Sequence, residues 1–186
     1  MILDSFLQFT GFPTVGGFVV TGTNSDAPTT GTQNSSNVID LHMSGIPVLT
    51  AGQGARDMGI GDDPALKLLV QVITAFTGGT SLQIALQGST DDGTGNPTGF
   101  TNWWLSPVYL EATMTAGTRL YDMDMPRPPA GVAIPRFLRL GYINGAGTHT
   151  TGSIGAWIVL DRADQRYNAT ANATWGGYPA GITVAN

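Results

Sequence analysis

Hydrophobic and polar residues alternate along much of this chain, which is the pattern of a half-buried β-strand. The clearest pair of strands covers residues 66–76 (LKLLVQVITAF) and 81–90 (SLQIALQGST), separated by a short connection of Gly and Thr. The first run is apolar on both faces, which favours a central strand covered on two sides. A second apolar pair, 136–143 (RFLRLGYI) and 153–161 (SIGAWIVLD), is joined by Gly, Thr and Asn and reads as a hairpin.

Shorter segments extend the predicted set of strands. Residues 37–43 (NVIDLHM) and 117–126 (GTRLYDMDMP) alternate with period two, and GGFVVT at 16–21 reads as a first strand after an N-terminal arm. Pro107 interrupts the run 103–114, which suits an edge strand or two short pieces. About eight strands with long connections predict an all-β fold, a jelly-roll-like antiparallel β-sandwich.

The two ends of the chain stand apart from this regular part. We expect one domain over residues 1–162, which includes the N-terminal arm, and an extended C-terminal tail over residues 163–186. The tail shows little periodicity and needs another surface to lie on, so its aromatic residues are candidate anchors. The aromatic candidates for contacts with other subunits are Phe6, Phe9, Phe12, Trp175 and Tyr178.

The amino-acid composition further limits the structural elements and functions to be expected. Only 11% of the 186 residues are charged, and Lys67 and Glu111 are the single Lys and the single Glu, so long amphipathic helices are not expected. The net charge of −5 and the lack of a basic stripe argue against nucleic-acid binding. No apolar run reaches the length of a membrane helix, and the N-terminus does not resemble a signal peptide, so we expect synthesis in a cytoplasm and no membrane partner.

No group of residues suits catalysis, a metal ion or a cofactor. The chain has no Cys, and neither the nucleophile-elbow motif nor the phosphate-binding loop occurs. Two His cannot form a zinc site alone: we expect His149 to be solvated in a loop, and His42 to lie on a strand as a packed or an interface residue. The acidic clusters lie mostly in Gly-rich segments, where Asp usually forms turns rather than a Ca²⁺ site. These clusters are Asp62–Asp63, Asp91–Asp92, and Asp122 with Asp124.

Aromatic and Arg residues supply the remaining candidates for contacts. Trp103 and Trp104 are adjacent on a strand, so we expect one in the core and the other at an interface. Arg136 and Arg139 are expected on opposite faces of their strand. Arg residues suit ion pairs between chains, but an ordinary surface role is equally open for each of them. The others in this group are Arg56, Arg119, Arg127 and Arg162, of which Arg56 is taken as an interface candidate.

Several motifs in this order carry a family resemblance. They are the opening MILD, then NVIDL, ARDMGIGDDPALKLLVQVITAFT, SLQIALQGSTDD and PRFLRLGYINGAGTHTTGSIGAWIVLD, covering residues 1–9 and 37–162. The combination resembles the small capsid cement, or decoration, proteins of tailed bacteriophages of the Bordetella-phage type. The resemblance implies a jelly-roll-like fold, a homotrimer on the outer surface of the icosahedral shell, the major capsid protein as partner, and no catalysis.

Two other functions stay open at this point. A jelly-roll module that binds carbohydrate or a host surface, with Ca²⁺ in the Asp loops, is the alternative to a cement protein. A glycan hydrolase on the same fold is the least favoured, because no pair of acids or nucleophile can be placed in a cleft. Fold alone distinguishes none of these functions.

Overall fold

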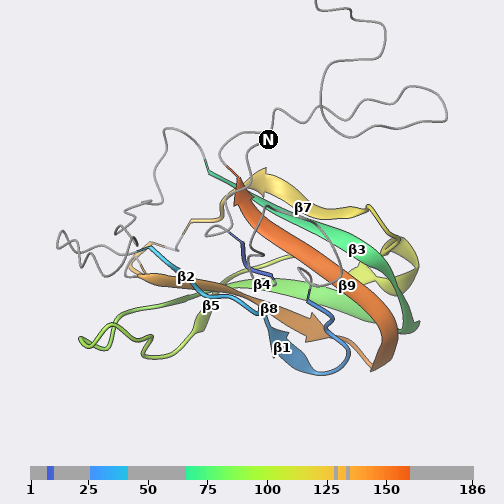
Figure 1. The fold of residues 1–186 in the computed structure, drawn as a ribbon, viewed down its shortest axis with the longest axis horizontal. Helices are drawn as coiled ribbons and strands as arrows, with labels where there is room; N and C mark the ends of the chain where they lie inside the picture. Colours follow the sequence, from blue (N-terminus) through green and yellow to red (C-terminus); the bar gives the residue numbers. More distant parts are fainter. Residues whose placement is uncertain (1–7, 11–25, 42–65, 128–129, 133–134, 160–186) are drawn as a thin grey trace, which may run out of the picture.

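Two antiparallel β-sheets pack face to face in the computed structural model of the chain, as Figure 1 shows. The structure describes residues 8–10, 26–41, 66–127, 130–132 and 135–159. In these residues the fold is an all-β sandwich, as predicted, and the regular elements besides strands amount to one short 3₁₀ turn, η3 (Glu111–Thr113). No helix among them is long and apolar enough to cross a membrane.

The larger sheet, sheet B, has six strands. Its main order is β1 (Thr32–Asn34), β8 (Phe137–Asn144), β4 (Ser81–Ser89) and β5 (Thr101–Leu105). Two short strands add to its ends: β2 (Ile39–Asp40) pairs with β8, and β6 (Tyr109–Leu110) pairs with β4. The run that contains Pro107 is therefore split into two short pieces at the edge of a sheet, as predicted.

The smaller sheet, sheet A, has the order β7 (Arg119–Asp124), β3 (Lys67–Gly79) and β9 (Gly147–Val159). β3 is its central strand; one face of β3 is buried in the main core, and the opposite face is buried at Leu69. Leu68, Val70 and Val72 face the main core, while Leu69 packs with Trp157 and Val159 on the opposite face. The prediction of a central strand is confirmed, and cover on its second face is seen around Leu69.

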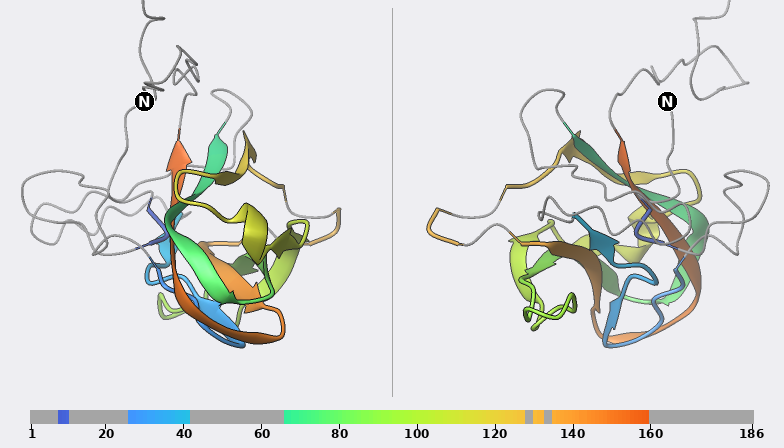
Figure 2. Two further views of the ribbon diagram at one scale, coloured as in Figure 1. Left: turned by 90° about the vertical axis from the view of Figure 1, so that its right-hand side faces the viewer. Right: turned by 60° about the vertical axis from the view of Figure 1, so that its left-hand side comes forward.

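The two expected strand pairs are wrong in their pairing, although each strand exists. β3 and β4 belong to different sheets, and so do β8 and β9. β3 instead pairs with β9, and β4 pairs with β8, so the two long segments run side by side through both sheets. Both segments bend at the same corner of the sandwich, where Gly79 lies opposite Gly147 in sheet A and Leu82 lies opposite Asn144 in sheet B (Figures 1 and 2).

His149 is buried at this corner, so the prediction of a solvated His in a loop is wrong. The segment taken for a loop is the start of β9, and the His149 ring contacts the Phe76 ring edge to face at 5.0 Å. A Cβ atom on Gly79 would lie 2.3 Å from the His149 ring, and one on Gly152 would lie 2.3 Å from the Phe76 ring. These two Gly residues therefore make room for the rings that fill the bend.

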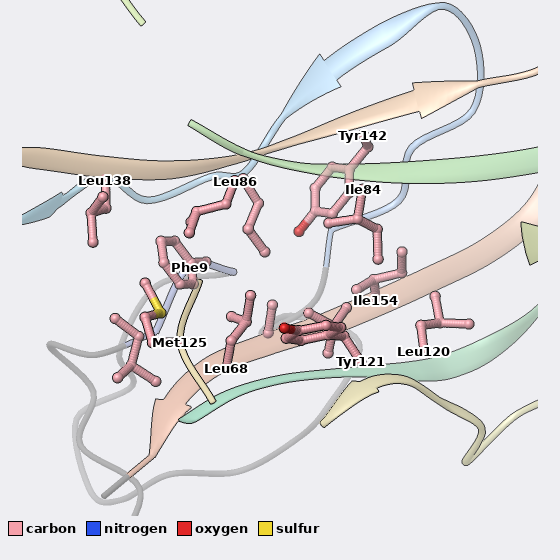
Figure 3. Close-up of a cluster of buried hydrophobic side chains, with 14 of the residues drawn as sticks. Phe9, Leu68, Ile84, Leu86, Leu120, Tyr121, Met125, Leu138, Tyr142 and Ile154 are labelled. Carbon is pink, nitrogen blue, oxygen red and sulfur yellow. The ribbon is translucent and has the colours of Figure 1, made fainter. Parts of the chain in front are cut away.

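The main core lies between the two sheets (Figure 3). Leu86, Leu138 and Tyr142 enter it from sheet B, and Leu68 and Ile154 enter it from sheet A. Each of these side chains follows the period-two alternation of its strand, which is why the sequence pattern located most of the core. Jelly-roll topology stays a prediction, because the described strands establish a two-sheet sandwich without tracing that path.

Candidate functional site

The residues predicted to contact other subunits lie mostly outside the described part of the chain. This applies to Phe6, Phe12, Arg56, Trp175 and Tyr178, and the tail 163–186 and strand 16–21 lie outside it as well. Phe9 is described, and its side chain is 0% exposed in the main core between the sheets (Figure 3). The prediction for Phe9 is therefore corrected: its ring stabilises the core of its own chain and presents no surface to a neighbour.

Phe9 is held in this position by a segment that we call the N-terminal cover, residues 8–10 and 26–41. The Phe9 N–H donates to the Ala156 carbonyl of β9 at 2.9 Å, and the Phe9 carbonyl accepts from the Asn37 N–H at 2.9 Å. Asp26 and Ile154 of β9 exchange two backbone hydrogen bonds. Since β1 of the same segment pairs with β8, the N-terminal cover joins the edges of both sheets along one side of the sandwich.

Asp26 is the centre of a half-buried polar cluster within the cover. Its carboxylate accepts hydrogen bonds from the Tyr142 hydroxyl at 3.0 Å and from the N–H and hydroxyl of Ser36. Burial raises the pKa of Asp26, because desolvation outweighs the hydrogen bonds that favour the charged form. The pKa of the fully buried Tyr142 hydroxyl is likewise raised well above its usual value by desolvation, with the Asp26 charge as the second cause.

A second polar cluster ties a loop to sheet B. The Arg136 guanidinium forms a two-point ion pair with Asp40, with nitrogen–oxygen distances of 2.8 and 2.9 Å, and also contacts Asp91. Asp91 and Asp92 accept backbone N–H bonds from the Gly-rich loop that follows them. The N–H of Gly95 is the main cause that lowers the pKa of Asp91. The prediction that this Asp pair forms turns is confirmed.

The Arg residues that the structure describes have contacts within their own chain. Besides Arg136, Arg119 pairs with Asp122 at 2.7 Å, and Arg139 lies 3.9 Å from the centre of the Phe100 ring. The ion pairs of Arg136 and Arg119 therefore favour an ordinary stabilising role over contacts with a neighbouring chain. In the described residues, no group of three or more His, Cys, Asp or Glu side chains is arranged to hold a metal ion.

The opposite side of sheet B ends in a surface that we call the β5–β6 edge, residues 101–110. The prediction that one of Trp103 and Trp104 points away from the core is wrong, because both pack against it. The register of β4 and β5 shifts between Leu86 and Gln87, which makes Trp103 an extra residue and breaks the alternation. A Cβ atom on Gly88 would lie 2.3 Å from the Trp103 ring, so this ring lies directly on the backbone of β4.

Besides the polar Thr101 and Asn102, this edge exposes aliphatic side chains. Leu105, Val108 and Leu110 are 48%, 57% and 61% exposed, and no charged residue occurs between Thr101 and Leu110. Sequence analysis identified this run as an edge but did not single out these residues. The available signal was the absence of charge over a predicted edge strand, because edge strands are ordinarily protected by charged side chains.

Comparison with known protein families shows which family this chain belongs to. The sequence profile of the Bbp16 family matches residues 24–158, which include every strand described above except the last residue of β9. The chain belongs to the Bbp16 family. This is a family of Bordetella-phage proteins, so the predicted phage origin is confirmed at that level. A search of curated proteins finds no match to the chain.

Proposed function

We propose that this Bbp16-family chain is a structural protein of the phage particle, a capsid cement protein without enzymatic activity. In this role it forms homotrimers on the outer surface of the icosahedral shell, where major capsid subunits meet. Each trimer links several capsid chains and stabilises the shell against the pressure of the packaged DNA. Membership of a phage protein family, shown over residues 24–158, is the observation that carries the proposal.

The chemistry of the described residues supports a binding role over a reactive one. The best-placed charged groups, Arg136, Asp40 and Asp91, are bonded to one another. The half-buried carboxylate of Asp26 accepts hydrogen bonds from Ser36 and Tyr142 within its own chain. The apolar side chains on the β5–β6 edge suit contact with another protein.

The physical basis of shell stabilisation is simultaneous binding. A single contact between one chain and one capsid subunit is weak, whereas a trimer that engages several subunits at once gains avidity from the linked contacts. A rigid sandwich suits this task because little conformational entropy is lost on binding.

The proposal is tested by measuring the mass of the purified chain by light scattering, and its sedimentation with phage shells assembled without it. We expect a trimer that sediments with the shells and raises their melting temperature. A monomer that stays in the supernatant would contradict the proposal. Binding of that monomer to glycans would instead favour the alternative, a module for carbohydrate or host-surface binding.

A further inference from the structure

Arg139 differs from the paired cations of the described residues because no carboxylate lies against it. Lys67, Arg119 and Arg136 each form an ion pair with an Asp. The Nε of Arg139 instead donates to the Gln87 side-chain oxygen at 2.6 Å, and its two terminal amino groups have no acceptor among the described residues. Burial lowers the pKa of Arg139, with no negative charge to oppose the effect. The described part of the chain therefore leaves this cation without a counter-ion.

The Arg139 side chain is held in place on the outer face of sheet B. Leu138 and Leu140 enter the core, so Arg139 between them faces outward. Its guanidinium carbon lies 3.9 Å from the centre of the Phe100 ring, directly before β5, while its Nε bonds Gln87 of β4. The side chain thus reaches from β8 across β4 toward β5. These two contacts position the guanidinium before a partner binds, which limits the entropy lost on association.

The amides beside Arg139 supply a further donor. Because a guanidinium can only donate hydrogen bonds, the amide oxygen of Gln87 faces Arg139. The Gln87 NH₂ group then donates to the Asn102 side-chain oxygen at 2.8 Å, which turns the Asn102 NH₂ group away from Gln87. Asn102 is exposed, and no described residue accepts from its NH₂ group. The outer face of sheet B therefore presents donors without an acceptor, which suits a carboxylate.

The chain also carries a carboxylate without a cation, on the loop between β4 and β5. Asp92 is exposed and forms no ion pair with any described residue. One of its oxygens accepts the N–H groups of Thr94 and Asn96 and the Thr94 hydroxyl. The Thr94 hydroxyl is the main cause that lowers the pKa of Asp92, so the carboxylate is charged at neutral pH. Figure 1 shows this loop projecting past the strands of sheet B.

Charge complementarity favours a second copy of this chain as the partner of Arg139. Copies with a net charge of −5 repel one another, so self-association favours a contact that sets a cation against a carboxylate. Arg139 and Asp92 do not pair within one chain, and they lie on different parts of its surface. Glu111 is another described carboxylate without an ion pair, but no hydrogen bond holds its side chain. Asp92 is fixed by its loop and loses less entropy on pairing.

We propose that Arg139 of one copy binds Asp92 of the next copy in a head-to-tail contact, with the Asn102 amide as a second donor to the carboxylate. Around a threefold axis, each copy gives Arg139 to one neighbour and Asp92 to the other, so the contacts close into a ring. This contact rests on the proposed function, because it belongs to the trimer of the cement protein. It names the two surfaces of each chain that meet in that trimer.

The first test reverses the two charges singly and together. R139E and D92K each set like charges against one another, so we expect assembly to need at least about tenfold more protein than the wild type does. Light scattering over a dilution series measures this concentration. The double variant, D92K with R139E, restores opposite charges and should assemble as the wild type does. E111K is the matched control, since it changes the net charge as D92K does, and it should assemble as the wild type does.

Thermal melting of each variant separates loss of the contact from loss of the fold. D92K lies on an exposed loop and should keep the melting temperature of the wild type. It carries the test alone if R139E does not fold. Weak assembly of folded D92K beside normal assembly of E111K supports the contact, whereas equal assembly of the two overturns it.

The remaining outcomes separate this contact from the function on which it rests. If R139E and D92K form normal trimers but no longer bind phage shells, these residues face the capsid, which overturns the contact and leaves the cement function standing. If the wild type forms trimers through these charges and ignores shells, the contact stands and the cement function is overturned. A wild type that stays monomeric overturns the trimer and the contact together.

A second measurement follows Arg139 directly. Phenylglyoxal reacts with accessible guanidinium groups, and mass spectrometry locates the modified residues in dilute and in assembled wild-type protein. Arg136 is the internal control, because its ion pairs with Asp40 and Asp91 form within one chain. We expect Arg139 to lose reactivity on assembly while Arg136 does not change. Equal reactivity of Arg139 in both states would contradict the proposed contact.

Discussion

The two sides of the sandwich differ in whether the described chain covers the edge of the sheet. On one side, the N-terminal cover joins β9 to β8 and inserts Phe9 between the sheets. On the other side, sheet B ends at the β5–β6 edge, where Leu105, Val108 and Leu110 are exposed. The covered side is completed by the chain itself, whereas the described residues leave the other side open to a partner.

The local chemistry of the two sides is nevertheless the same. Ser35 directly follows β1 and Ser106 directly follows β5. Each Ser donates its N–H to the carbonyl of a residue in the neighbouring strand and accepts the N–H of that same residue with its hydroxyl oxygen. The partner is Leu140 for Ser35 and Ile84 for Ser106. The difference between the two sides therefore lies in what covers them and not in how the sheet ends.

Among the tests of this difference between the two sides, a substitution of Phe9 is expected to cause the largest loss of stability. F9A removes a fully buried ring from the core and should lower the free energy of unfolding by about 3–5 kcal/mol. This loss in the free energy of unfolding is measured by denaturant titration followed by Trp fluorescence. A loss below about 1 kcal/mol would mean that the cover adds little to the sandwich, and the contrast between the two sides would fail.

The two Ser residues should give smaller losses of similar size. S35A and S106A each leave a buried N–H without its acceptor, so each should lower the free energy of unfolding by about 1–3 kcal/mol. T113A is the matched control, because the exposed Thr113 hydroxyl bonds only the nearby Leu110 carbonyl, and a change within about 0.5 kcal/mol is expected. Losses that differ strongly between S35A and S106A would show that the two ends of sheet B are not equivalent.

The pH dependence of stability should arise partly within the cover, at Asp26. Because the pKa of Asp26 is raised in the folded chain, its contribution is fully present below the unfolded pKa of about 4 and is lost as the pH rises through the folded pKa. The stability of D26N relative to the wild type should therefore increase as the pH rises across this window. Urea titrations of both proteins at several pH values test it, and a constant difference would contradict the raised pKa.

The smallest effect is expected on the open side. L110A truncates a side chain that is 61% exposed, so the free energy of unfolding should change by no more than about 0.5 kcal/mol. The same denaturant titration that is used for F9A measures this change. A loss of several kcal/mol in the isolated chain would show that Leu110 is already covered in solution, and the β5–β6 edge would then not be open.

The positions of the strands were easier to predict from the sequence than the pairing between strands. Alternation correctly located β3, β4, β7 and β8, because burial of one face imposes period two on the residues themselves. It also separated the buried Ile39 and Leu41 from the exposed Val38 and Asp40. It could not show that β3 and β4 separate at the corner, because the short link at Thr80 is equally compatible with a hairpin and with a change of sheet.

The candidate site was harder to predict than the fold. Phe9 was predicted to contact another subunit and is buried instead, because an arm that contacts a neighbour and an arm that completes its own core have the same composition. Trp103 and Trp104 were misplaced because a bulge in β5 cancels the alternation on which the prediction depended. The exposure of Leu105 depends on which strands flank β5, and no local pattern reports that.

The sequence by itself determined that this chain is an all-β protein with few charges, where its strands lie, and which family it belongs to. Those properties follow from local periodicity and residue identity, which each segment carries alone. The tertiary structure decided which strands pair, that Phe9 and His149 are buried, and that one edge of sheet B is covered while the β5–β6 edge is exposed. These outcomes depend on contacts between residues far apart in the chain, such as Phe9 with Ala156 and Gly79 with Gly147, and such contacts leave no periodic signal in the sequence.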